Sequence, residues 1–296
     1  MKTIIYATDC STNASSSLCY AYRFSSMMKA DLHVIHVYDM PPINLSTIHP
    51  KETLSKRIHD EQKDMVTKYC TTHLKNEFRK KPITIHAVEN DSITNGIIKL
   101  SKKLSPDLVV LGMKDPESTR GYFSGNIANA LLDRVEVPIL IVPNSFGCNS
   151  LSTIVYATAF EQEDILSIKK LVEIAKPFSA LIEVIHVYEN DEDSIKKSME
   201  IFKNLILKQV SYPEITFRTI ASGKIKSGLL AFLKKENANM LVMLERTNKN
   251  SFNGLFHKDL VKELEAVVTI PVLAFNKQSA KLKVVKTTNV KNEVTY

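Results

Sequence analysis

The sequence predicts an α/β fold that is built twice, each copy having a five-stranded parallel sheet with helices on both faces. The first observation behind this prediction is a repeat. The segment TIIYAT at residues 3–8 returns as TIVYAT at 153–158, and VIHVYD at 34–39 returns as VIHVYE at 184–189. Both pairs are separated by the same 150 residues, which indicates an internal duplication.

The second observation is the alternation of short apolar runs with segments of helical spacing along both copies. Strands that alternate with helices are joined by right-handed crossovers, which gives a parallel sheet covered on both faces. The third is the length of 296 residues, about twice that of a usual domain. We therefore expect domains at residues 1–143 and 151–276, a linker at 144–150 and a tail at 277–296.

In the first copy, β-branched apolar runs predict the strands, and apolar residues three or four apart predict the helices. The small polar residues 11–17 suit the N-terminal cap of the first helix, which continues to residue 28. Further helices are expected at 50–78, at 92–104 and from about Asn126. The predicted strands are residues 3–8, 32–38, 82–88, 108–111 and 139–142.

The second copy repeats this pattern. Helices are expected at residues 191–210, 226–235 and 258–266. The predicted strands are residues 153–158, 184–189, 215–221, 239–244 and 271–275. In the tail, the segment LKVVK at 282–286 alternates enough to form an extra strand.

Composition describes an ordinary soluble globular protein, with 44% hydrophobic and 24% charged residues. No apolar run approaches the roughly 20 residues needed to cross a bilayer. The apolar run near the N-terminus is too short for a signal peptide, so a cytoplasmic location is expected. The four cysteines have neither metal-ligand nor C-x-x-C spacing and are interpreted as reduced bystanders. They are Cys10, Cys19, Cys70 and Cys148.

The formal charge of +7 raises the question of a nucleic-acid partner. However, the lysines are scattered over the predicted helices, and no basic stripe is interleaved with aromatic residues. A nucleic-acid partner is therefore not favoured, and a membrane partner is not expected.

The stretch at residues 107–143 combines features of an anion site. A buried strand ends at Gly112, a polar loop with Pro116, Gly121 and Gly125 follows, and a helix begins near Asn126. Unpaired backbone N–H groups and the positive end of a helix dipole would point at one place.

This stretch resembles the C-terminal part of a universal stress protein domain of the UspA family. ATP-binding members of that family carry glycine, two residues, a second glycine, nine residues, a third glycine and then serine or threonine. The spacing here fits at Gly112, Asp115, Gly125 and Asn126, although Asp115 replaces the second glycine and Asn126 replaces the hydroxyl residue. With the repeated strands, the resemblance covers nearly the whole chain and identifies a tandem universal stress protein.

The resemblance implies flavodoxin-like domains, also described as adenine nucleotide alpha hydrolase-like, with strand order 3-2-1-4-5. It places a ligand crevice between the first and fourth strands, where ATP with Mg²⁺ is the implied cofactor. An Asp just after the first strand lies near the base or ribose in the family, and Asp9 matches it. The candidate ligand-binding residues are Asp9, Ser11, Val37, Gly112, Lys114, Gly125 and Asn126.

Two features decide how well each copy suits phosphates. In the first copy, Asp115 adds a negative charge near the expected phosphates, and Lys114 and Arg120 are the cations that would offset it. In the second copy, Ala159 replaces the Asp and Leu244 replaces the first glycine, which prevents close backbone approach. Nucleotide binding is therefore expected only in the first copy.

Other polar residues are interpreted as structural. His33 and His36 are three apart on a strand and face opposite sides, which argues against a metal pair. His36 and its repeat His186 are predicted to be hydrogen-bonded core residues. Ser11 and Ser124 lack a paired base and are read as cap or loop residues. No catalytic residue and no metal ligand is assigned.

These observations favour a non-enzymatic binding or regulatory protein of the stress response. The alternative is a weak ATP hydrolase that uses the same site, although no residue stands out for positioning Mg²⁺ or the attacking water. The last strands, 139–142 and 272–275, would be apolar sheet edges that seek a partner. The resemblance implies that such strands join two domains, so we expect an intramolecular pseudo-dimer, and a homodimer is also compatible with it.

Overall fold

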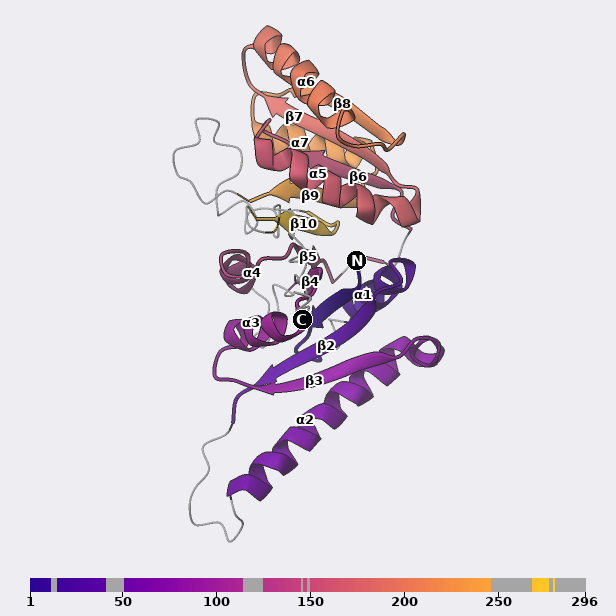
Figure 1. Ribbon diagram of the computed structural model, residues 1–296, viewed down its shortest axis with the longest axis vertical. Helices are drawn as coiled ribbons and strands as arrows, with labels where there is room; N and C mark the ends of the chain where they lie inside the picture. Colours follow the sequence, from indigo (N-terminus) through magenta and orange to yellow (C-terminus); the bar gives the residue numbers. More distant parts are fainter. Residues whose placement is uncertain are drawn as a thin grey trace, which may run out of the picture.

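A single sheet of ten strands runs through the molecule (Figure 1). The computed structural model describes residues 1–11, 15–40, 51–113, 125–144, 146–147, 150–245, 268–276 and 279. Within these residues the strand order is β3-β2-β1-β4-β5-β10-β9-β6-β7-β8. Each half of the sheet therefore has the order 3-2-1-4-5, as predicted.

The strands lie close to their predicted positions. In the N-terminal half they are β1 (Thr3–Ala7), β2 (Asp31–Tyr38), β3 (Ile83–Glu89), β4 (Leu108–Gly112) and β5 (Ile139–Val142). In the C-terminal half they are β6 (Thr153–Ala157), β7 (Leu181–Tyr188), β8 (Ile215–Ala221), β9 (Met240–Leu244) and β10 (Val272–Phe275).

The helices connect these strands. The α-helices of the N-terminal half are α1 (Ser15–Met27), α2 (Lys51–Leu74), α3 (Ile93–Leu104) and α4 (Gly125–Leu132), and a 3₁₀ helix, η2 (Lys75–Arg79), follows α2. Those of the C-terminal half are α5 (Gln162–Ala175), α6 (Glu192–Leu207) and α7 (Ile225–Lys235), with a 3₁₀ turn, η3 (Lys176–Phe178), after α5. The predicted helix at 258–266 and strand at 282–286 lie outside the described residues.

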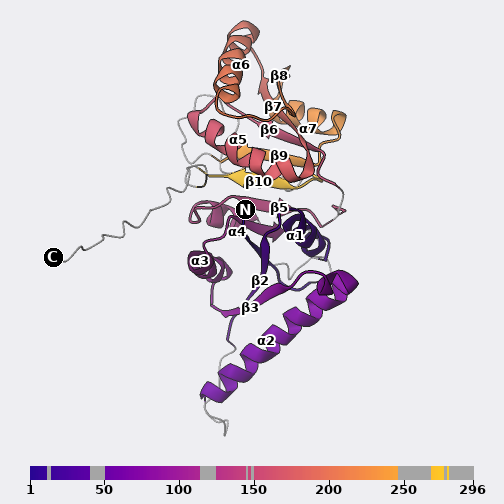
Figure 2. The same ribbon diagram turned by 45° about the vertical axis from the view of Figure 1, so that its right-hand side comes forward.

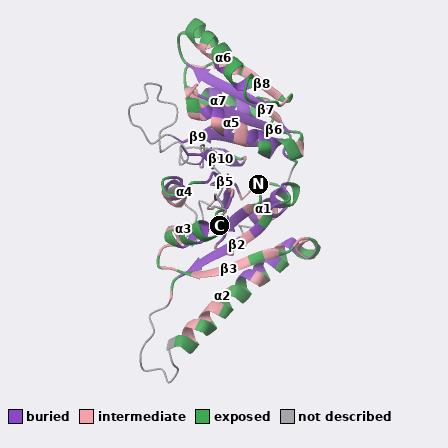
Figure 3. Ribbon diagram, viewed as in Figure 1, coloured by how far each residue is buried: buried purple, intermediate pink, exposed green. Residues whose placement is uncertain are grey.

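The helices form a layer on each face of the sheet (Figure 2). In β1, Ile4 and Tyr6 face one core and Ile5 and Ala7 face another, as the two-residue period of a strand requires. The first core extends through both halves beneath α1, α2, α5 and α6. The opposite face is covered by α3 and α4 in one half and by α7 in the other. The central strands are accordingly buried on both sides (Figure 3).

The two halves meet through their last strands. β5 and β10 pair antiparallel, with Leu140 opposite Leu273 at the centre of the contact, whereas the other neighbouring strands in the described sheet are parallel. The backbone edges of these two apolar strands are thereby hydrogen-bonded to each other and not exposed. Among the helices that the structure describes, none is both long and apolar enough to span a membrane.

Candidate functional site

The candidate site lies at the carboxyl ends of β1 and β4. β1 has β2 on one side and β4 on the other, so the chain reverses direction along the sheet at this point. Connections from neighbouring strands then diverge to opposite faces and leave a crevice, which is where open α/β sheets bind ligands. Ala7 pairs with Leu111, so the residues that follow, Asp9 and Gly112, emerge on either side of the crevice.

Asp9 organises the turn that leads from β1 to α1. The backbone N–H of Ser11 donates to Oδ1 of Asp9 at 3.0 Å, and that of Cys10 donates to Oγ1 of Thr8 at 3.0 Å. Cys10 adopts a left-handed backbone with φ of 58°, a conformation unusual for a side chain other than glycine, asparagine or aspartate. The Asp9 carboxylate and the Ser11 backbone are thus held together at the crevice.

Val37 presents its backbone to the same crevice. The pairing of β2 with β1 stops at Ile35, whose carbonyl accepts the N–H of Thr8 at 3.0 Å. On the other side of β2, the carbonyl of Tyr38 accepts the N–H of Asn90 at 3.0 Å. Since successive residues in a strand turn their backbone groups to alternate neighbours, the N–H and C=O of Val37 point past the end of β1. Its side chain is buried in the core shared with α3.

Gly112 has a packing role that sequence reasoning missed. A Cβ atom at this position would lie 2.6 Å from Oγ and 3.3 Å from Cβ of Ser17 on α1. Ser17 itself is fully buried and shares a 2.9 Å hydrogen bond with the hydroxyl of Tyr6. The glycine therefore lets α1 approach β4, whether or not a ligand needs the same space. A close approach of helix and strand of this kind leaves no motif in the sequence.

Gly125 and Asn126 form the first turn of α4, so the predicted start of this helix is confirmed. The first backbone N–H groups of a helix have no partner within it and favour an anion. Lys114, Asp115 and Arg120 lie outside the described residues, and so do the other positions of the predicted phosphate loop. The structure accordingly places four of the candidate residues near the carboxyl ends of β1, β2 and β4, namely Asp9, Ser11, Val37 and Gly112.

The corresponding turn in the C-terminal half has the same backbone but is filled by side chains. Phe160 has φ of 66°, matching Cys10, and its ring stacks on His186 with centroids 4.3 Å apart. The same ring meets Phe202 of α6 edge to face at 5.6 Å. An aromatic side chain thus packs toward α6 and the core at this turn, where the N-terminal half carries a thiol.

Asp164 completes the closure of that turn. Its carboxylate is fully buried and accepts hydrogen bonds from the hydroxyls of Tyr156 and Thr158, at 2.7 and 2.8 Å. The backbone N–H groups of Ala159 and Glu161 donate to it as well, at 3.2 and 3.0 Å. The donors of this turn are committed to an internal anion, so the turn offers them to no ligand.

The histidines of β2 and β7 test the prediction that they are hydrogen-bonded core residues. His36 and His186 are buried, and Nδ1 of each is hydrogen-bonded to a backbone carbonyl, that of Thr8 and Thr158 respectively. The prediction of core histidines is confirmed for both. His33 instead faces His86 on β3, with Nδ1 to Nε2 at 2.9 Å, a pair that sequence reasoning missed. Only the β2–β3 register brings the two rings together.

The thiols of Cys10 and Cys70 are poorly suited to nucleophilic attack. Burial raises the pKa of the Cys10 thiol, and that of Cys70, to about 12, so both are neutral near pH 7. Within the described part of the chain, no three His, Cys, Asp or Glu side chains converge as ligands for a metal ion. The cysteines at positions 10, 19 and 70 are reduced, and Cys148 lies outside the described residues.

Comparison with known proteins places this geometry in context. Residues 1–143 match the universal stress protein family. Among solved structures, a universal stress protein from Archaeoglobus fulgidus aligns over 93% of this chain and 96% of its own, with 15% identity and a TM-score of 0.61. A functionally unknown protein from Pseudomonas aeruginosa aligns over 95% of this chain and 94% of its own, with 12% identity and a TM-score of 0.58.

The same arrangement occurs in a different setting. The cytoplasmic domain of a prokaryotic cation chloride cotransporter aligns over 94% of this chain and 98% of its own, with 8% identity and a TM-score of 0.53. No curated protein matches the chain. At such low identities these structures establish the fold alone, and function has to be argued from the site.

Proposed function

Because this chain belongs to the universal stress protein family through its domain at residues 1–143, we propose that it is a non-enzymatic binding and regulatory protein of the stress response. Its N-terminal half would bind an adenine nucleotide, ATP being the first candidate, or another small anionic ligand. The C-terminal half, residues 151–276, would be a second domain of the same kind with a chiefly structural role.

The observation that carries this proposal is the backbone of Val37. Its N–H and C=O point together past the end of β1, toward the crevice that Asp9 borders. A donor and an acceptor side by side on a strand edge match the hydrogen-bonding edge of a purine base, which also offers both. Asp9 would then lie near the ribose, and the first turn of α4, with Gly125 and Asn126, would meet the phosphates.

The joined sheet supports the rest of the proposal. The antiparallel pairing of β5 with β10 supports an intramolecular pseudo-dimer of the two halves, in which residues 144–150 would be the linker. A cytoplasmic location fits a protein that responds to nucleotide. The metal usually carried by ATP has no assigned ligand, because the described residues contain no cluster that suits Mg²⁺.

Titration calorimetry of the full chain with ATP tests the proposal. We expect saturable binding to one site per chain, weakened about tenfold or more by Asp9→Ala if the carboxylate hydrogen-bonds the ligand. The matched control is Glu189→Ala, an exposed carboxylate after β7 in the C-terminal half, which should bind as the parent does. Equal affinity for ATP in Asp9→Ala and the parent would remove Asp9 from the site.

A second variant tests the phosphate side. Gly125→Val places a branched side chain at the first turn of α4, so it should weaken ATP binding more than adenosine binding. If it bound both ligands as the parent does, the α4 terminus would not hold phosphates. The alternative activity, weak ATP hydrolysis, is measured in the same samples as phosphate release, which the binding proposal predicts to equal that of a protein-free control.

A further inference from the structure

A cavity lies near the amino ends of the strands, at the opposite end of the sheet from the candidate site. Its lining residues come from the end of α1, the start of β2 and the segment around η2, together with Leu151 and Phe178 from the C-terminal half. These segments precede their strands, whereas the candidate nucleotide crevice follows β1 and β4. The cavity therefore spans the junction between the two halves and shares no residue with that crevice.

The floor of this cavity is aromatic and apolar. Phe24 of α1 stacks on Phe178 of η3 with centroids 5.6 Å apart, and Tyr20 stacks on Phe24 at 6.0 Å. Leu151 adds an aliphatic surface, and Met27 stands at the mouth with half of its side chain exposed. The volume is about 740 Å³, which lies within the usual range of roughly 300–1,000 Å³ for small-molecule sites.

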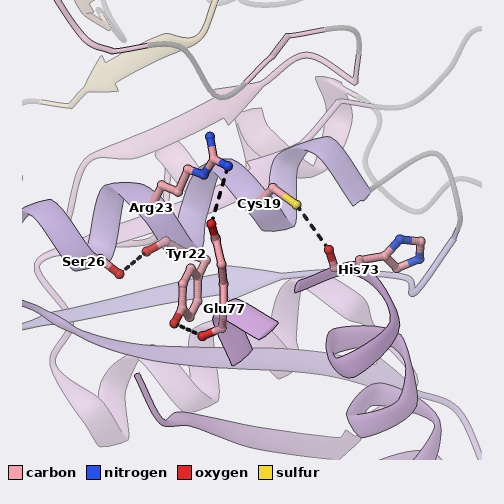
Figure 4. Close-up of polar contacts among 6 residues, drawn as sticks. All are labelled: Cys19, Tyr22, Arg23, Ser26, His73 and Glu77. Atoms are coloured by element: carbon pink, nitrogen blue, oxygen red, sulfur yellow. Dashed lines mark hydrogen bonds and ion pairs between the residues drawn. The ribbon is translucent and has the colours of Figure 1, made fainter. Parts of the chain in front are cut away.

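The wall of the cavity carries more positive than negative side chains. Arg23, Lys29, Lys80 and Lys81 line it together with only two carboxylates, Asp31 and Glu77. Glu77 is already engaged, since Arg23 forms an ion pair with it at 3.6 Å and the hydroxyl of Tyr22 donates to its backbone carbonyl (Figure 4). Within the described residues, neither Lys29 nor Lys80 has an ion-pair partner. An apolar cavity with surplus positive charge suits an anion that also has an apolar part.

Lys81 supplies a fixed point for such a charge. Its ammonium group is half-buried and donates to Oγ of Ser25 at 3.0 Å and to the backbone carbonyl of Ala30. An ammonium has three N–H donors, so these two bonds position it and leave one donor for a ligand. Burial lowers the pKa of Lys81 because it removes water around the charge, and the nearby carboxylate of Asp31 opposes this shift.

We propose that this cavity binds an amphipathic monocarboxylate, with its apolar body on Phe24 and Phe178 and its carboxylate on Lys81. Lys29 and Lys80 would add attraction at the mouth. The site is independent of the nucleotide crevice, so either can be present without the other. Because residues of both halves line the cavity, a bound ligand would contact both sides of the junction between them.

Calorimetric titration of the full chain with decanoate tests the chemistry. Decanoate should bind, and decanol, which has the same apolar body without the charge, should bind about tenfold or more weakly, because a charge-assisted hydrogen bond is lost. Lys81→Met should cause a similar loss for decanoate. Lys208→Met, an exposed lysine at the end of α6, is the matched control and should leave affinity unchanged.

The double variant Lys29→Glu/Lys80→Glu separates binding from folding, because both positions are exposed and outside the core. It should weaken decanoate binding several-fold and leave decanol binding as it is. Equal affinities for decanoate and decanol in the parent would overturn the proposal. Unchanged decanoate affinity in both lysine variants would also overturn it.

The location is tested with a fluorescent reporter, since the chain has no tryptophan. Met27→Trp places one indole at the mouth of the cavity, and Leu205→Trp places one on α6 at a similarly exposed apolar position. Saturating decanoate should shift the emission of the first to shorter wavelength and leave the second unchanged. A shift in Leu205→Trp alone would show binding elsewhere and refute the assignment. ATP should not displace decanoate.

Discussion

The turns after β1 and β6 share one backbone and differ in what they hold. Cys10 and Phe160 both have a left-handed conformation, and a carbonyl two residues earlier in each turn accepts from a buried histidine. Yet the second turn is filled by the Phe160 ring and by a buried carboxylate, that of Asp164. The position equivalent to Asp164 in the first copy carries alanine in the sequence. The two copies have thus kept the backbone of the turn and differ in the side chains that it holds.

The two turns differ in whether their hydrogen-bond donors are used within the protein. An external anion needs donors that are left open in the protein, whereas Asp164 uses those donors internally. Helix packing follows the same division. Gly112 lets Ser17 approach β4, while the corresponding end of β9 carries Leu244, which is buried in the core. We expect the N-terminal turn to tolerate changes that the C-terminal turn does not.

The largest effect is expected for Asp164→Ala. Two hydroxyls and two backbone N–H groups would lose a buried charged acceptor, so the free energy of unfolding should fall by about 3 kcal/mol or more. Urea denaturation followed by circular dichroism measures this change. Asp9→Ala, in the other turn, should cost about 1 kcal/mol, because the backbone N–H of Ser11 loses its hydrogen bond to the carboxylate. Similar losses in both variants would contradict the division between the halves.

The next effect concerns Gly112. In Gly112→Ala the new methyl group would lie 2.6 Å from Oγ of Ser17, so α1 has to shift, at a cost of about 2 kcal/mol. Ser17→Ala in the same chain should recover part of this loss, because the clashing oxygen is removed. Gly223→Ala is the control, since no atom lies within 4 Å of a Cβ there. A loss of ATP affinity in Gly112→Ala without loss of stability would assign the glycine to the ligand instead.

The repeated strands could be predicted because they depend on local patterns, whereas their order was implied by the family resemblance. TIIYAT and TIVYAT carry β-branched apolar runs, and the duplication doubled the signal. The helix predicted at residues 50–78 begins at Lys51, but its regular part ends at Leu74 and continues as η2. Near this transition the backbone carbonyls of His73 and Glu77 accept hydrogen bonds from Cys19 and Tyr22 of α1, and sequence periodicity does not report such contacts.

The candidate site was predictable only where it follows a strand end. The family resemblance implied the strand order, and Asp9 and Gly112 were predicted to border the crevice because ligands bind at the carboxyl ends of the strands where that order reverses. The pairing of His33 with His86 and the contact of Gly112 with Ser17 depend on register and helix approach, which involve residues distant in sequence. The cavity lined by Phe24, Phe178 and Lys81 had no sequence signal, because it forms only when the two halves pack together.

A smaller effect on the free energy of unfolding is expected at Asn276, where the two halves differ at their junction. Nδ2 of Asn276, just after β10, donates to the carbonyls of Leu132 and Val135 at the end of α4, at 2.6 and 2.7 Å. The equivalent position after β5 is Pro143, whose side chain has no donor. Asn276→Ala should lower the free energy of unfolding by about 1–2 kcal/mol. Asn204→Ala, on an exposed part of α6, is the control and should change it by less than about 0.5 kcal/mol.

The smallest effects are expected from pH, at a pair of equivalent positions. His33 on β2 and Glu183 on β7 are 150 residues apart and occupy the same place in each sheet. Burial lowers the pKa of His33, and burial together with His33, Lys103 and Lys63 lowers the pKa of His86 to about 4. Burial raises the pKa of Glu183, and Arg218 opposes that change only in part.

The two halves should therefore respond to pH in opposite directions. The His86 contribution to stability is present above its unfolded pKa of about 6.5 and is lost as the pH falls toward 4, because the unfolded chain binds the proton first. The Glu183 contribution is present below the unfolded pKa of about 4.3 and is lost as the pH rises through the folded value. Melting temperatures of His86→Gln should consequently decline less than those of the parent between pH 6.5 and 4, whereas Glu183→Gln should gain on the parent above pH 4.3. If the difference from the parent changed with pH in the same direction for His86→Gln and for Glu183→Gln, the two halves would not respond to pH in opposite directions.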